Sequence, residues 1–156
     1  MTAGFELSTS DSLGAYMLRC TFEGSVQFPE VGFNVNVLQP GQPSSMYHAE
    51  DAQEGFLVVS GECLLVVEEE ERRLRPWDFF HCPAGTSHVL VATGEGPCIF
   101  VAFGARREGR GVRYPVSEVA QAHNAGVARE TTSPRSAYRH VPPTRYGKAY
   151  RSGDLP

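Results

Sequence analysis

Short apolar segments separated by glycine and proline dominate the first two thirds of the chain. Turn residues recur at intervals of roughly ten residues, a pattern typical of all-β sandwiches and barrels. No helical periodicity interrupts this region, so we expect antiparallel pairing, because parallel strands need long crossover connections. The expected strands cover residues 13–22, 33–38, 56–60, 63–67, 79–82, 87–93 and 99–103.

The pattern changes at Gly104, where a stretch rich in glycine and arginine predicts an exposed linker. Apolar positions at helical spacing then predict one short helix over residues 115–123. From Val127 onward apolar residues are few, which indicates an extended arm. We therefore expect a β-barrel over residues 1–104, followed by a basic C-terminal linker, short helix and arm over residues 105–156.

Charge separates the same two parts of the chain. Residues 1–104 hold fourteen acidic and four basic residues, a net of −10, whereas residues 105–156 hold four acidic and ten basic residues, a net of +6. Six consecutive charged residues, 68–73, predict a solvated hairpin tip. The basic tail has no aromatic residues interleaved among Arg106, Arg107, Arg110 and Arg113, so we expect no nucleic-acid partner. Its charge instead suits docking on an acidic barrel, either its own or that of a second copy in a homodimer.

Composition and cysteine spacing restrict the class of protein. With 41% hydrophobic residues among 156, the chain can build a core, which excludes wholesale disorder. The four cysteines contain no CxxC pair and three of them lie in apolar surroundings, so we expect buried thiols in a reducing compartment. No signal peptide and no long apolar run is visible, so we expect a cytoplasmic protein without a membrane partner.

Two separate segments carry the candidate metal chemistry. His48 and Glu50 share one face if they lie on a strand, and a turn after them would bring Glu54 to the same place. A second tight turn, Pro83-x-Gly85, delivers His88 onto the start of another strand. Imidazole and carboxylate ligands together suit one divalent transition metal. Iron, manganese, nickel and zinc all accept such ligands, and the sequence does not distinguish them.

These residues resemble the two motifs of the cupin superfamily, in the manner of its small single-domain members. The resemblance covers roughly residues 33–103 and implies a double-stranded β-helix, the cupin or jelly-roll barrel, with a metal held inside by His48, Glu54 and His88. It also suggests a homodimer. The matching residues are Gly41, His48, Glu54, Gly61, Pro83, Gly85 and His88.

The chain departs from the family pattern in ways that bear on chemistry. Glu50 stands where the family usually has a second histidine, and one extra residue separates Gly41 from His48. Trp77 replaces the glycine that opens the second motif, and no asparagine closes that motif. Glu50 can be a fourth ligand, can orient an imidazole, or can act as a general base. The catalytic residues are thus unassigned, with Glu50 as the candidate.

Two functions follow from this set of residues. The first is a metal-binding enzyme that acts on a small molecule inside the barrel, a dioxygenase or an isomerase by the family resemblance. The second is a non-catalytic cupin that binds or senses a small molecule without metal. Fold alone does not choose between them.

Overall fold

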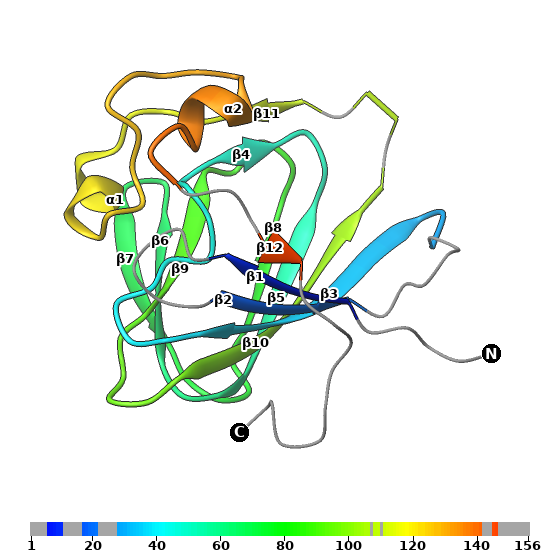
Figure 1. Cartoon of the computed structure of the whole chain (residues 1–156), viewed down its shortest axis with the longest axis vertical. Coiled ribbons are helices and arrows are strands. Elements are labelled where there is room, and N and C mark those ends of the chain that lie inside the picture. The colour runs from blue at the N-terminus through cyan, green and yellow to red at the C-terminus, as the bar shows by residue number, and fades with distance from the viewer. Residues whose placement is uncertain are drawn as a thin grey trace.

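The structure is a computed structural model that describes residues 6–10, 17–21, 28–106, 108–109, 111–141 and 145–146. Within these ranges the chain is built mainly from strands, which form a barrel with two short helices at one end (Figure 1). The expected all-β architecture is therefore confirmed. The strands are β1 (Glu6–Ser10), β2 (Met17–Thr21), β3 (Val31–Leu38), β4 (Ala49–Glu50), β5 (Glu54–Ser60), β6 (Cys63–Val67), β7 (Glu70–Leu74), β8 (Phe79–Cys82), β9 (His88–Ala92), β10 (Cys98–Ala105), β11 (Val112–Arg113) and β12 (Arg145–Tyr146). The helices are α1 (Glu118–Ala122) and α2 (Pro134–Ala137).

Two antiparallel sheets enclose the core. The larger sheet has the order β12-β1-β2-β3-β10-β5-β8, and the smaller has the order β7-β6-β9. Inward side chains from both sheets form one buried cluster, which includes Leu38, Phe56 and Phe100 from the larger sheet and Leu65 and Leu90 from the smaller. Alternation along each strand explains this, because residues i and i+2 face the same side.

Strands β6 and β9 of the smaller sheet are buried on both faces, because the C-terminal segment covers their outer side. The outward residues Leu64, Val66, Val89 and Val91 pack with Ala120 of α1 in a second cluster. Figure 1 shows α1, in yellow, beside β6, β7 and β9. This cover explains why every residue of β6 and β9 is buried. The segment after the barrel is thus a layer of the fold and not a free tail.

The acidic run, as we call the six charged residues 68–73, is only partly a solvated hairpin tip. Its turn residues Glu68 and Glu69 have φ angles of 47° and 67°, and the remaining charges form β7. Glu71 Oε1 lies 2.6 Å from Nε2 of His123, just after α1. The run therefore carries part of the interaction that holds the C-terminal segment, which the expectation of a solvated tip missed.

The remaining differences concern element bounds. The helix expected over residues 115–123 is the shorter α1, and the expected arm contains α2. The first expected strand, residues 13–22, is described only as β2, and the rest of it lies outside the described residues. Within the described part of the chain, no helix has the length and apolar character needed to cross a membrane.

Candidate metal centre

The backbones of the two candidate histidines are paired directly. His88 N donates to His48 O at 2.8 Å, and His48 N donates to His88 O at 3.2 Å, which makes an isolated antiparallel bridge. Residues directly opposite in such a pair place their side chains on the same face. The two imidazole ring centroids accordingly lie 5.0 Å apart. Two residues that lie 40 positions apart in the sequence are thus brought together by one pair of backbone hydrogen bonds.

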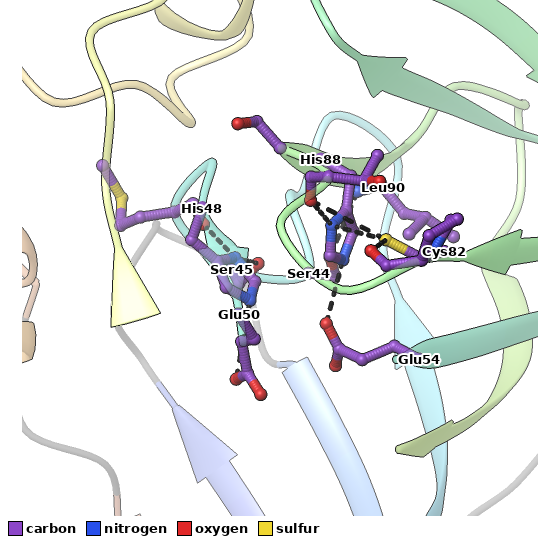
Figure 2. A network of polar contacts seen from close by, with 12 residues as sticks. Ser44, Ser45, His48, Glu50, Glu54, Cys82, His88 and Leu90 are labelled. Carbon is purple, nitrogen blue, oxygen red and sulfur yellow. Dashed lines mark hydrogen bonds and ion pairs between the residues drawn. The ribbon is translucent and has the colours of Figure 1, made fainter. Parts of the chain in front are cut away.

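The His88 ring is oriented by the turn that precedes it. Its Nδ1 lies 3.1 Å from Thr86 O and 3.2 Å from the sulfur of Cys82. A carbonyl oxygen can only accept a hydrogen bond, so Nδ1 carries the proton that it donates to Thr86. The opposite nitrogen, Nε2, lies 3.4 Å from Glu54 Oε2 (Figure 2). In the neutral ring this Nε2 offers a lone pair toward the glutamate.

His48 has the same arrangement. Its Nδ1 lies 2.8 Å from Met46 O, so this nitrogen is also the hydrogen-bond donor. Its Nε2 lies 3.8 Å from Glu50 Oε1. Each imidazole therefore gives its Nδ1 proton to a backbone carbonyl and presents Nε2 to a carboxylate. A backbone acceptor on one ring nitrogen is the arrangement that orients metal-binding histidines in proteins.

Glu54 reaches this place from the first residue of β5. In the sheet register it lies opposite Gly104 of β10 on one side and Cys82 of β8 on the other. A Cβ at Gly104 would come within 3.4 Å of Glu54 Cγ, so glycine leaves the space that the side chain uses. One ligand atom each from His48, Glu54 and His88 lie within 4.8 Å of one another.

Burial determines the protonation of the groups around this point. Desolvation by burial, together with the neighbouring His48, lowers the pKa of His88 to about 4. His88 is thus neutral at pH 7. Burial, with nearby Glu54 second, raises the pKa of Cys82 to about 12, so this residue is a thiol and not a thiolate. The site therefore offers nitrogen and oxygen ligands.

These donors fit a divalent transition metal. Two ligands bound to one such ion at about 2.1 Å each lie roughly 3.0–3.5 Å apart, which matches the 3.4 Å between His88 Nε2 and Glu54 Oε2. A neutral imidazole lone pair facing a carboxylate at this distance is repulsive unless a cation or a proton lies between them. Two imidazoles with one carboxylate are also a set that non-haem iron, and other first-row metals, accept.

Glu50 lies beside this group of three but does not belong to it. It comes from β4, which pairs with β11 of the C-terminal segment. Glu50 lines the same cavity, and its Oε1 lies 3.8 Å from Nε2 of His48. Figure 2 shows Glu50 next to His48 and apart from Glu54. The assignment of Glu50 as a ligand stays a prediction, and so does the full set His48, Glu50, Glu54 and His88.

A cavity of about 320 Å³ contains these residues, and several of its polar groups were not singled out by sequence analysis. Asn34 and Asn36 line it from β3, and alternation with apolar residues could have indicated that both amides share one face. Arg106, expected in an exposed linker, also lines it. Tyr114 and Tyr138 line it from the C-terminal segment, and no spacing in the sequence indicates this.

Comparisons with known proteins show which family model and which solved structures this barrel resembles. The family model described as Cupin domain matches residues 34–104. No curated protein matches the chain. Solved structures do: a sugar phosphate isomerase of the cupin superfamily from Silicibacter pomeroyi has 27% identity and a TM-score of 0.54, over 60% of this chain and 63% of that one.

Two further structures have similar barrels. A protein from Acidithiobacillus ferrooxidans, proposed to be a sugar phosphate isomerase, has 24% identity and a TM-score of 0.59 over 64% of this chain and 65% of that one. A predicted oxalate decarboxylase from Thermotoga maritima has 17% identity and a TM-score of 0.57 over 67% of this chain and 94% of that one. The chain spans less than two thirds of the length of the first two proteins.

The match and the shared barrel agree with the motif residues and with the double-stranded β-helix expected from them. Its carbonyl-oriented histidines and its glutamate stand at the positions of the family motifs. Residues 34–104 thus match the Cupin domain model, and the barrel that they form is similar to those of cupin-superfamily proteins.

Proposed function

We propose that this chain is a metal-dependent cupin enzyme of the isomerase type, which moves a proton within a small polar molecule bound in the barrel. The observation that carries the proposal is the matched orientation of His48 and His88. Both rings donate through Nδ1 to a backbone carbonyl and turn Nε2 into the cavity, where Glu54 lies 3.4 Å from His88. Such pre-orientation is what a metal ligand needs and a merely packed histidine does not.

In this proposal the residues have separate roles. His48, Glu54 and His88 hold the ion, whereas Asn34 and Asn36 orient the polar groups of the small molecule from β3. A bound divalent ion supplies a Lewis acid that polarises a carbonyl oxygen and so acidifies the neighbouring C–H bond. The aromatic rings that line the cavity exclude water from this bond.

Glu50 favours an isomerase over a dioxygenase. Its carboxylate lines the cavity beside His48, where it can accept a proton from one carbon of the small molecule and return it to the next. This step needs no oxidant, because one C–H bond breaks while another forms. The likeness to the Silicibacter sugar phosphate isomerase, at 27% identity, supports the same class of reaction.

Elemental analysis of protein purified without added metal tests the ion. We expect close to one equivalent of a first-row transition metal in the wild-type protein, and its loss in His88→Gln, which keeps the size of the side chain but removes the Nε2 ligand. His81→Gln is the matched control, because His81 is exposed and contacts Gln53. Retained metal in His88→Gln would contradict the proposed ion site. If the wild-type protein holds no metal and His88→Gln has the same thermal stability as wild type, the alternative of a non-catalytic binding protein is favoured.

The reaction class is tested with a panel of small sugar phosphates and hydroxy acids incubated in D₂O. An isomerase incorporates deuterium into the substrate carbon without consuming oxygen, and Glu50→Gln stops this exchange while it retains the metal. Oxygen consumption by the metal-loaded protein would instead identify a dioxygenase.

A further inference from the structure

Two tyrosines of the C-terminal segment form one wall of the cavity. Tyr114 follows β11, and Tyr138 directly follows α2. Both line the cavity that holds His48, yet both lie beyond residues 34–104, the part of the chain that matches the family model. This wall is therefore supplied by this chain's own extension and not by the cupin motifs.

The wall is rigid. Tyr114 is 5% exposed, and its backbone pairs with Thr131 in both directions, at 2.8 Å and 3.2 Å. Its ring lies 5.9 Å from the His48 ring at a tilt of 34°, and 5.9 Å from the Tyr138 ring at 90°. Met46, Val127 and other apolar residues pack behind it. Packing on several sides thus holds the Tyr114 ring against His48 and the Tyr138 ring against Tyr114.

The hydroxyl groups of the pair are also ordered. The Tyr138 oxygen accepts a hydrogen bond from Met46 N at 3.1 Å. Burial is the main cause that raises the pKa of Tyr114. The nearby ionisable groups of Tyr138 and Glu50, and a hydrogen bond with Tyr138, raise it further. Tyr114 is therefore a neutral phenol at pH 7, which can donate a hydrogen bond. The backbone donor Met46 N holds the Tyr138 oxygen in place.

We propose that Tyr114 and Tyr138 determine which small molecules bind, by presenting a fixed hydroxyl donor to a carboxylate or similar anionic oxygen of the molecule at the metal site. This inference rests on the proposed function, because it places the donor beside the ion held by His48. The nearby carboxylates Glu50 and Glu54 would otherwise repel an anionic molecule. A fixed donor in a buried wall offsets part of that repulsion and discriminates against molecules without an anionic oxygen.

Calorimetric titration of the Co(II)-loaded protein tests the wall with two probes of similar size, glycerate and glycerol. Glycerate has a carboxylate and glycerol has a hydroxymethyl group in its place. We expect the wild-type protein to prefer glycerate and Tyr138→Phe to bind it about tenfold more weakly, because one hydrogen bond to a charged group is lost. Affinity for glycerol and for Co(II) should not change. Tyr114→Phe keeps the ring but removes the other hydroxyl group of the wall, and it should show a loss of the same kind.

Tyr47→Phe is the matched control, since Tyr47 is buried in the cluster under α1 and does not line the cavity. It should leave both probe affinities unchanged. Equal glycerate affinity in wild type, Tyr138→Phe and Tyr114→Phe would overturn the inference, as would wild-type protein that does not prefer glycerate to glycerol. A parallel loss of Co(II), glycerate and glycerol binding in both tyrosine variants would show a structural role and would also overturn it.

Failure of the proposed function has a different signature. If wild-type protein takes up no Co(II), the ion site is wrong, and the same titrations are then made on metal-free protein. A tyrosine-dependent preference for glycerate there would support the wall alone, and its absence would overturn the wall as well.

Discussion

The cupin core and the C-terminal segment, residues 111–141, are both packed parts of one fold, but they are recognisable in different ways. The core is identified by residue types at fixed spacing, such as His48, Glu54 and His88. The segment has no motif, and yet it covers the outer face of β6 and β9 and supplies two cavity-lining tyrosines. The core holds the residues that fit an ion, whereas the segment shapes the space around them.

The region that matches the Cupin domain model can therefore be compared with other proteins, whereas the C-terminal segment is particular to this chain. The candidate ligands lie within the matched residues 34–104. Tyr114 lies outside them, at a ring distance of 5.9 Å from His48. A likeness confined to the core therefore says little about which molecule binds. The C-terminal segment is the more informative place to look for the residues that select which small molecule binds.

The largest expected effect is on the free energy of unfolding, and it is measured by substitutions on the two faces of β9. Leu90 is fully buried in the barrel core, and Val91, at 2% exposure, faces the C-terminal segment. We expect Leu90→Ala to lower the free energy of unfolding by about 2–5 kcal/mol and Val91→Ala by about 2 kcal/mol, measured by urea denaturation. If the segment packed only loosely, Val91→Ala would cost well under 1 kcal/mol, and the description of it as a layer would be wrong.

The next effect is a dependence of folding stability on pH, and it arises from His88 in the core. The pKa of His88 is lowered to about 4, mainly by burial and then by His48, so between pH 6.5 and about 4 the unfolded chain binds a proton there that the folded chain does not. The metal-free protein should therefore lose about 3 kcal/mol of stability as pH falls through this range. Urea unfolding in EDTA at several pH values measures it. His88→Gln should remove this part of the slope, and an identical slope in the variant would contradict the assignment.

The smallest effect concerns the contact between α1 and the barrel. The Ser117 hydroxyl accepts from Ala120 N at 3.0 Å as the N-cap of α1, and donates to Glu69 Oε2 at 3.0 Å. We expect Ser117→Ala to lower the free energy of unfolding by about 1 kcal/mol. Ser117→Asp tests the two bonds separately, because it keeps a capping oxygen but places a second carboxylate beside Glu69. An unchanged stability in Ser117→Ala would show that the cap does not hold the segment.

The site could be predicted from the sequence only where spacing carries information. His48 and Glu50 alternate along one strand, and a tight turn precedes His88, so their meeting could be expected from local geometry and family motifs. The cavity-lining positions of Asn34 and Asn36 were visible only as alternation, because a polar residue on a strand usually indicates the solvent face. In this barrel that face is the cavity.

Local sequence determined that the chain forms short antiparallel strands, since apolar alternation and glycine- or proline-rich turns act over a few residues. Together with the motif residues, it also determined the cupin class and three candidate ligands. Only the tertiary structure decided that Glu71 of the acidic run contacts His123, and that Tyr114 and Tyr138 line the cavity. These contacts join positions 50 to 90 residues apart, and pairings at such separations depend on how whole elements pack, which no local spacing records.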